Sequence, residues 1–193
     1  MIATLLLAAG SSSRMGGRDK LLEPIEGVPL LEVLARRAIS VGPVFVTLPP
    51  GDHARRFALP QAAQPVEVAD ADLGMAHSIR AGIDALPDAS IGVMILPADM
   101  PDISADDLAA IKARALETRA RIVRATTENG EPGHPIYFAA SEFPRFDTLT
   151  GDVGAFSLCE GMEADTETVP LNGDRARLDL DTPEDWDAYL MGR

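Results

Sequence analysis

Short apolar runs alternate along the chain with segments of helical periodicity. The apolar run 2–9 predicts a buried strand, because a strand covered on both faces has few polar positions. After Pro29, apolar side chains recur at helical spacing to about Val41, which predicts a helix that ends at Gly42 and Pro43. The same patterns predict further strands at 44–48, 66–69, 91–96, 122–126, 135–139, 166–171 and 177–180, and further helices at 53–57, 75–86, 104–118, 141–149, 153–161 and from 182 onward.

Strands that alternate with helices predict an α/β fold. We expect a single-domain, three-layer, Rossmann-like fold with a mainly parallel sheet and right-handed crossovers. The 193 residues, of which 46% are hydrophobic, suit one domain with a sizeable core. Residues 128–171 interrupt the alternation, and we expect them to form a lobe over the sheet edge where the parallel strands end and ligands bind.

The loop after the first predicted strand combines small residues with positive charge. Gly10 and three serines follow this strand, and Arg14, Arg18 and Lys20 come soon after them. Small residues let the backbone approach a ligand, and free N–H groups and cations can hold phosphates. The loop has neither the Gly-Lys-Ser/Thr ending of the P-loop nor the dinucleotide motif Gly-x-Gly-x-x-Gly. The alternative is that the three cations are ordinary solvated side chains.

The charge of the whole chain makes these cations unusual, because the formal net charge is −13 at pH 7. An acidic surface repels nucleic acid, so we expect no nucleic-acid partner. A free nucleotide remains compatible with this charge, since local cations act over a Debye length of about 8–10 Å.

The chain shows no targeting or membrane signal. The apolar stretch 2–9 is too short for a signal peptide and lacks a basic flank, and no run is long enough to cross a bilayer. We therefore expect a cytoplasmic location and no membrane partner. The single cysteine, Cys159, excludes an internal disulfide and a Cys-rich metal site, and we expect it to be a buried, inert thiol in a helix.

Two aspartates are candidates for metal binding. Asp99 follows the strand 91–96, and a carboxylate facing phosphates would be repelled unless it held Mg²⁺. The alternative for Asp99 is a turn or helix-capping role. Asp181 precedes the predicted final helix, so capping and metal ligation are both open, and Asp179 shares its face if this segment is extended.

The histidines carry less information. His134 lies in a constrained turn, 133–135, that can present a polar side chain to the cleft, whereas we expect His77 to be a surface or half-buried residue. No Ser/His/Asp order or Cys/His pairing occurs, which argues against hydrolysis by a nucleophilic side chain. The pattern favours phosphoryl or nucleotidyl transfer, where positioning and charge neutralisation do most of the work and an ionised phosphate acceptor needs no base.

Six motifs in one order make the chain resemble the nucleotidyltransferases with a sugar-nucleotidyltransferase-like fold. The chain is most similar to the molybdenum cofactor cytidylyltransferases and their guanylyltransferase relatives. The motifs are Leu-Ala-Ala-Gly-Ser-Ser-Ser-Arg-Met-Gly at 7–16 with Lys-Leu-Leu at 20–22, Gly-Met-Ala-His-Ser-Ile-Arg-Ala-Gly at 74–82, Pro-Ala-Asp-Met-Pro at 97–101, Gly-His-Pro at 133–135, Gly-Asp-Val-Gly-Ala at 151–155 and Asp-Thr-Pro-Glu-Asp at 181–185.

The resemblance implies a reaction and a site. The phosphate of molybdopterin, or of its metal-loaded form, attacks the α-phosphorus of a nucleoside triphosphate, and pyrophosphate leaves. By the same analogy the catalytic residues are Arg14, Lys20 and Asp99, with Mg²⁺ bound by Asp99 and Asp181. The implied nucleotide-binding residues are Leu7, Ala8, Ala9, Gly10, Ser11, Arg14, Lys20, Gly74, Ser78 and Asp99, and the implied acceptor-binding residues are Gly133, His134, Pro135 and Asp152.

The resemblance also implies how the domain is divided and which base it takes. Residues 1–127 would form the nucleotide-binding half, and 128–193 an acceptor-binding lobe with the C-terminal helix. Relatives that use GTP tend to have Ala-Gly-Gly where this chain has Ala8-Ala9-Gly10, so we expect CTP, with a methyl group at Ala9 narrowing the slot for a purine. A pterin phosphate would be the acceptor, and a molybdoenzyme a possible recipient.

Two departures keep alternatives open. The loop between Met15 and Lys20 is one residue longer than usual, so Arg18 competes with Lys20 for the phosphate role. Val153 and Phe156 stand where the family often has Lys and Arg, so the acceptor can differ. The alternatives are a nucleotidyltransferase that uses GTP or another small phosphate acceptor, and a non-catalytic carrier of the molybdenum cofactor.

Overall fold

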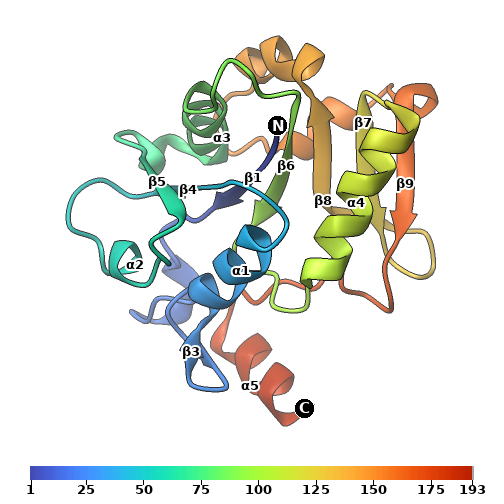
Figure 1. The fold of residues 1–193 in the computed structure, drawn as a ribbon. Helices are drawn as coiled ribbons and strands as arrows, with labels where there is room; N and C mark the ends of the chain where they lie inside the picture. The colour runs from blue at the N-terminus through green and yellow to red at the C-terminus, as the bar shows by residue number, and fades with distance from the viewer. Residues whose placement is uncertain (193) are drawn as a thin grey trace.

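A seven-stranded sheet forms the centre of the structure, a computed structural model that describes residues 1–192 (Figure 1). The strand order is β5-β4-β1-β6-β8-β7-β9. Neighbouring strands are parallel except at β8, which runs antiparallel to β6 and β7. The strands are β1 (Ile2–Leu7), β4 (Val44–Leu48), β5 (Ala63–Glu67), β6 (Gly92–Pro97), β7 (Ile122–Thr126), β8 (Pro132–Ala139) and β9 (Thr166–Pro170), with a separate hairpin of β2 (Pro24–Ile25) and β3 (Val28–Pro29).

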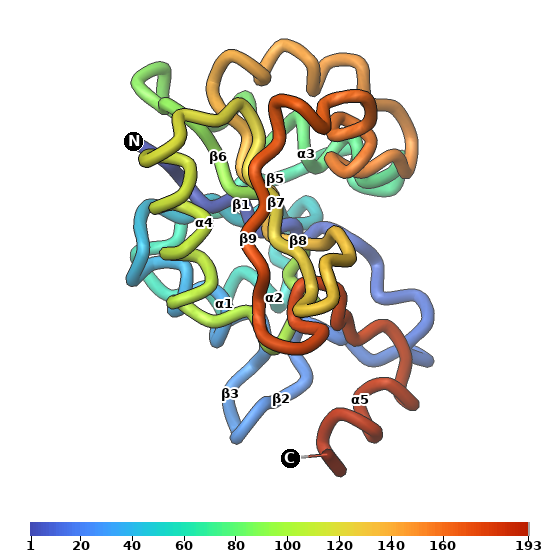
Figure 2. Tube along the Cα trace, turned by 90° about the vertical axis from the view of Figure 1, so that its right-hand side faces the viewer, coloured from blue at the N-terminus to red at the C-terminus, as the bar shows by residue number. Residues whose placement is uncertain are grey.

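Helices cover both faces of this sheet and give three layers (Figure 2). On one face lie α1 (Leu30–Ile39) and α4 (Ala105–Thr118), and on the other lie α3 (Met75–Asp84) and the 3₁₀ helices η3 (Ala140–Thr148) and η4 (Ala155–Cys159). The remaining helices are α2 (Ala54–Phe57), α5 (Pro183–Met191), η1 (Ser13–Met15), η2 (Ala71–Leu73) and η5 (Glu163–Asp165). The predicted single-domain, three-layer α/β fold with a mainly parallel sheet is confirmed.

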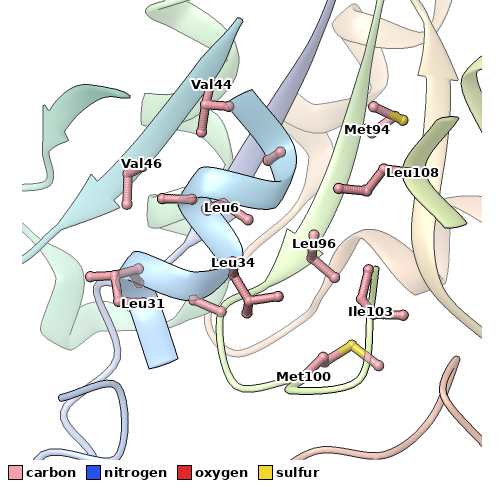
Figure 3. Packing of buried hydrophobic residues seen from close by; sticks show 14 of the residues in the cluster. Leu6, Leu31, Leu34, Val44, Val46, Met94, Leu96, Met100, Ile103 and Leu108 are labelled. Carbon is pink, nitrogen blue, oxygen red and sulfur yellow. The ribbon is translucent and has the colours of Figure 1, made fainter. Parts of the chain in front are cut away.

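The core explains why the central strands read as continuous apolar runs. Alternate residues of a strand point to opposite faces of the sheet. Leu6 of β1 therefore packs on the side of Leu34 from α1 and Leu108 from α4 (Figure 3), whereas its neighbour Leu5 packs on the side of Ile79 from α3. All five side chains are fully buried, so both faces of the sheet need apolar residues.

Two helices begin at the predicted caps, and both caps form a reciprocal capping box. Ser104 accepts the backbone N–H of Asp107 at 3.1 Å, and the Asp107 carboxylate accepts the backbone N–H of Ser104 at 2.9 Å. At α5, Thr182 and Asp185 exchange the same bonds at 3.2 and 2.8 Å. These residues satisfy the helix starts, so Asp181 does not serve as the cap of α5.

The second half of the chain departs from the expected elements. Residues 128–171 contribute two strands to the sheet, because β8 pairs with both β6 and β7 and β9 pairs with β7. The segments expected as α-helices at 141–149 and 153–161 form 3₁₀ helices, and Pro144 within η3 has no N–H to donate to a helical ladder. The prediction of a strand at 177–180 is wrong. Arg177 lies in a turn, where its N–H donates to the Asp174 carbonyl, and residues 178–180 form no strand.

Smaller differences have local causes. Strand β5 begins at Ala63 rather than at Val66, and it contains Pro65, which an edge strand tolerates. Cys159 is buried as expected but lies in the 3₁₀ helix η4. None of the helices within residues 1–192 has the length and hydropathy of a membrane span. The cytoplasmic location stays a prediction.

Candidate active site

A cavity of about 1180 Å³ lies beyond the carboxyl ends of β1, β4 and β6. Its volume is large for a small-molecule site and suits two ligands side by side. The predicted site residues that line it are Leu7, Ala9, Gly10, Ser11, Arg14, Lys20, Gly74, Ser78, Asp99, Gly133, His134, Asp152 and Asp181. Ala8 and Pro135 are buried beside it and do not line it. Segments far apart in the sequence therefore meet at one site.

Lys20 bridges two carboxylates at the floor of this cavity. Its Nζ lies 2.5 Å from Asp99 Oδ2 and 2.6 Å from Asp181 Oδ1, and Arg14 Nη1 lies 2.8 Å from Asp181 Oδ2. Burial alone would lower the pKa of Lys20, but the charges and hydrogen bonds of Asp99 and Asp181 outweigh it and raise this pKa. Burial likewise opposes the charge on Asp181, yet Lys20 and Arg14 hold the pKa of Asp181 below its usual value. Lys20 and Asp181 are therefore ionised at neutral pH.

A third carboxylate, Asp179, completes an oxygen cluster with Asp99 and Asp181. One carboxylate oxygen from each residue lies within 4.8 Å of the others. Burial, and then the charges of Asp99 and Asp181, raise the pKa of Asp179, so a cation among the three would be favourable. Asp99 Oδ1 is buried and has no hydrogen-bond partner among residues 1–192. This all-oxygen donor set fits a divalent cation such as Mg²⁺ or Mn²⁺.

The loop that carries Arg14 and Lys20 is held in shape by Arg55, a residue that the sequence analysis missed. Arg55 is 1% exposed, and its Nη1 donates to the carbonyls of Ala8 and Gly10, each at 2.6 Å. Its Nε and Nη2 donate to the carboxylate of Asp19 at 2.7 and 2.8 Å. Arg55 lies in the one-turn helix α2, where its sequence neighbourhood gives no signal of this role.

Two other candidate residues, Arg18 and His77, lie outside the cavity. Arg18 Nη1 lies 3.3 Å from Glu23 on the surface, and Arg18 does not line the cavity. Of the two candidates for the phosphate role, the geometry thus places Lys20 in the cavity and Arg18 outside it. His77 pairs with Asp70 and is half-buried outside the cavity, as expected.

Two of the motifs meet through their glycines. Gly74, at the start of α3, has a φ of +117° and packs against the backbone of Gly151, where an added Cβ would lie 2.3 Å from the Gly151 carbonyl. The backbone N–H of Ala76 donates to the Gly151 carbonyl at 3.0 Å. Ser78 follows on the same helix and faces the cavity, and Asp152 lines the cavity from the other chain segment.

The opposite end of the cavity is formed by β7, β8 and η4. His134 belongs to β8 rather than to a free turn, and its backbone N–H donates to the Ala176 carbonyl at 2.7 Å. At Gly133 a Cβ would lie 1.9 Å from that same carbonyl oxygen, so only glycine fits. Burial, and then the charge of Arg124, lower the pKa of His134 to about 4, so its imidazole is neutral at pH 7.

Arg124 itself lines the cavity and was missed by the sequence analysis. It is 6% exposed, and its guanidinium carbon lies 4.1 Å from the centroid of the Phe156 ring. A signal was present, because Arg124 is the single charged residue in the otherwise apolar strand 122–126.

The site sets cations that can hold phosphates against carboxylates that can hold a divalent cation. Both groups lie at one edge of a mainly parallel sheet. This arrangement fits a nucleotidyltransferase. The chain belongs to the family of the MobA-like NTP transferase domain, which matches residues 4–168. Its substrate class is therefore a nucleoside triphosphate.

Several named proteins and solved structures are similar to this chain. The purine catabolism protein PucB of Bacillus subtilis is 33% identical over 95% of this chain and 93% of its own length. The bifunctional protein GlmU of Alkalilimnicola ehrlichii is 34% identical over 59% of this chain, which spans only 25% of that protein. The crystal structure of Rv0371c from Mycobacterium tuberculosis has a TM-score of 0.86 and 26% identity, with 98% of this chain and 97% of that chain covered.

Proposed function

We propose that the protein transfers the nucleotidyl group of CTP to the phosphate of molybdopterin, or of its metal-loaded form, with release of pyrophosphate. The observation that carries the proposal is the contact of Lys20 with Asp99 and Asp181 at the end of the loop 8–20. The proposal is supported because this contact brings a candidate phosphate-binding cation and candidate metal ligands to one point of the cavity. Membership of the NTP transferase family favours an enzyme over the non-catalytic carrier.

The nucleotide would occupy the end of the cavity formed by the loop 8–20 and α3. Arg14 and Lys20 would bind the triphosphate, because both point into the cavity and carry full positive charge at neutral pH. Leu7, the backbone of 9–11, Gly74 and Ser78 would enclose the base and ribose, with Ala8 buried behind them. The methyl group of Ala9 narrows this end and favours cytosine over a purine.

Asp99, Asp179 and Asp181 would hold the divalent cation, which we propose to be Mg²⁺. The cation supplies neutralisation of the charge on the phosphate oxygens. A structure of Rv0371c in complex with manganese supports a divalent cation in a protein of this fold.

The transfer needs no general base on the protein. The acceptor phosphate is ionised near pH 7, and one of its oxygens forms the new bond to the α-phosphorus. The bond between the α-phosphorus and its bridging oxygen breaks, and pyrophosphate leaves with that electron pair. Lys20 and Arg14 would stabilise the negative charge that develops on the leaving group. Neutral His134 does not compete as a base, since its pKa is about 4 and it lies with Arg124 at the other end of the cavity.

A second candidate keeps the reaction and changes the substrates. Val153 and Phe156 are exposed apolar residues beside the cavity where the resembled family often has cations. The name of PucB, a purine catabolism protein, also points to an acceptor other than molybdopterin in a related protein. The second candidate is therefore GTP, or another small phosphate as acceptor.

Pyrophosphate release separates these candidates. The protein is incubated with Mg²⁺, molybdopterin and each of CTP, GTP, ATP and UTP in turn, and we expect release with CTP. Asp99→Asn is the matched variant, which should bind nucleotide but lose turnover. Release with GTP alone would favour the second candidate, and no release with CTP would contradict the proposed function.

A further inference from the structure

Two arginines are buried among the described residues, and they differ in how their charges are balanced. Arg55 has the carboxylate of Asp19 within 2.8 Å and donates to two carbonyls. Arg124 has no carboxylate partner within residues 1–192. Its Nε donates to the Gly133 carbonyl at 3.2 Å, and its buried Nη2 has no hydrogen-bond partner in the described part of the chain. A buried guanidinium without a counter-charge is costly, which calls for an anion that the protein itself does not provide.

The surroundings of Arg124 are also electropositive. Arg177 also lines the cavity, and its Nε lies 3.7 Å from Glu131 Oε2. Burial lowers the pKa of Arg124 most, Cys159 raises it and the charge of Arg177 lowers it, although an arginine stays protonated at neutral pH. His134 is neutral and supplies no negative charge. The three acidic residues of the cluster, Asp99, Asp179 and Asp181, form a separate group that Lys20 and Arg14 already contact. An anion at this end of the cavity is therefore attracted from two sides.

An apolar surface lies next to this charge. The Phe156 ring is stacked against Arg124, yet 46% of Phe156 is exposed. Val153 and Met75 are 45% and 43% exposed, and they lie in the two chain segments that meet at Gly74 and Gly151. A ring on the face of a guanidinium leaves the N–H groups at its edge for an anion. A ligand that combines an anionic group with a flat or apolar part matches both features.

We propose that Arg124 binds an anionic group of the acceptor other than the phosphate that attacks the α-phosphorus, and that Phe156 contacts the flat part of the same molecule. This inference rests on the proposed function, since it takes the end of the cavity opposite the loop 8–20 as the acceptor side. It assigns the acceptor to the class of small molecules that carry, besides the reacting phosphate, a second anionic group next to a planar ring. Arg124 is then a specificity residue for the acceptor and makes no contact with the nucleotide.

Simple probes test this assignment without any assumption about the natural acceptor. The full chain is saturated with CTP and Mg²⁺ to fill the nucleotide end, and phenyl phosphate and benzoate are titrated in by calorimetry. The variants are Arg124→Gln, which removes the charge, and Arg124→Lys, which keeps the charge and loses the planar guanidinium. Arg36→Gln is the matched control, because Arg36 pairs with Glu32 on the outer surface of α1.

We expect at least one probe to bind, the Arg124→Gln variant to bind it at least tenfold more weakly, and Arg124→Lys to lie between the two. Binding of phenyl phosphate indicates a site for a phosphate group, and binding of benzoate indicates a site for a carboxylate. The Kd for CTP should stay within twofold in all variants, which also shows that they are folded. If neither probe binds wild type, or if Arg124→Gln binds as tightly as wild type, the inference is overturned.

Turnover then separates this inference from the proposed function. With molybdopterin and CTP, Arg124→Gln should raise the KM for the acceptor at least tenfold and leave the KM for CTP within twofold. If wild type does not turn over molybdopterin but its probe binding still depends on Arg124, the proposed acceptor is wrong and the assignment of Arg124 stands. If molybdopterin is turned over and its KM is the same in Arg124→Gln, the assignment of Arg124 is wrong and the proposed function stands.

Discussion

The Nζ of Lys20 lies 2.5 Å from Oδ2 of Asp99, across 79 positions of sequence. The loop after β1 and the loop after β6 are neighbours because β1 and β6 pair in parallel, so their carboxyl ends meet at one edge. The same ammonium group lies 2.6 Å from Asp181. Lys20 therefore neutralises carboxylates that a divalent cation would also use, and Lys20 and the cation compete for the same oxygens.

This competition predicts opposite effects of one substitution. In Lys20→Met, the carboxylates of Asp99 and Asp181 lose the ammonium group that neutralises them. We therefore expect Mn²⁺ to bind about tenfold more tightly without nucleotide, a change of roughly 1.4 kcal/mol in binding free energy. The same variant should lose about 100-fold in kcat/KM, because the triphosphate loses a charged partner. Calorimetry with Mn²⁺ and a pyrophosphate assay measure the two effects. Unchanged or weaker Mn²⁺ binding would show that Lys20 does not compete for these oxygens.

Asp179 gives a second prediction, because only the structure places it with Asp99 and Asp181. We expect Asp179→Asn to weaken Mn²⁺ binding about tenfold and Asp99→Asn to weaken it further, because Asp99 is the less exposed ligand. The matched control is Asp187→Asn, an exposed carboxylate on α5 that should bind Mn²⁺ as wild type does. Equal Mn²⁺ affinity for Asp179→Asn and Asp187→Asn would remove Asp179 from the site.

Arg55 and its sequence neighbour Arg56 form a matched pair for stability. Arg55→Met leaves the carbonyls of Ala8 and Gly10 and the carboxylate of Asp19 without their partner, so we expect a loss of about 3–5 kcal/mol in unfolding free energy. Arg56 pairs with Glu67 on the surface at 3.1 Å, and Arg56→Met should cost less than about 1 kcal/mol.

Urea unfolding of both variants gives the comparison, and CTP affinity should fall in Arg55→Met because the loop 8–20 loses its support. Equal unfolding free energies for the two variants would show that Arg55 does not hold this loop.

His134 predicts a dependence of stability on pH. Its pKa is lowered from 6.5 to about 4, so the folded protein binds fewer protons there than the unfolded chain between these values. The contribution of neutral His134 to the unfolding free energy is fully present above pH 6.5 and is lost as the pH falls towards 4. The unfolding free energy of wild type should therefore fall relative to His134→Gln by about 3 kcal/mol across this window. A difference that is constant from pH 7 to pH 4.5 would contradict the lowered pKa of His134.

The sequence was enough to predict many of the strands and helix starts. Continuous apolar runs mark strands such as β4 and β7 to the residue, and Ser104 and Thr182 mark helix starts, because these signals are local. Strand β8 pairs with β7 across the short connection 127–131, but its antiparallel pairing with the distant strand β6 was not predictable, because such a pairing leaves no local signature. The 3₁₀ helices η3 and η4 share the apolar spacing of α-helices, which explains their misassignment.

The candidate site shows the same division. Lys20, Asp99 and Asp181 were predictable because each follows a strand or precedes a helix at the ligand-binding edge of the sheet. Arg55 was not, because its role lies in hydrogen bonds to the backbone of a segment 45 or more residues away. Arg124 was visible as a charge within an apolar strand, but only the structure shows that it reaches the cavity.

The most direct test of nucleotidyl transfer, the central claim, is to follow a labelled phosphorus of CTP into the products. CTP labelled at the α-phosphorus, and in parallel CTP labelled at the γ-phosphorus, are incubated with the protein, Mg²⁺ and molybdopterin, and the products are separated. Nucleotidyl transfer predicts the α-label in a pterin dinucleotide and the γ-label in pyrophosphate. A γ-label on the acceptor, or no label on it from either CTP, would contradict the account.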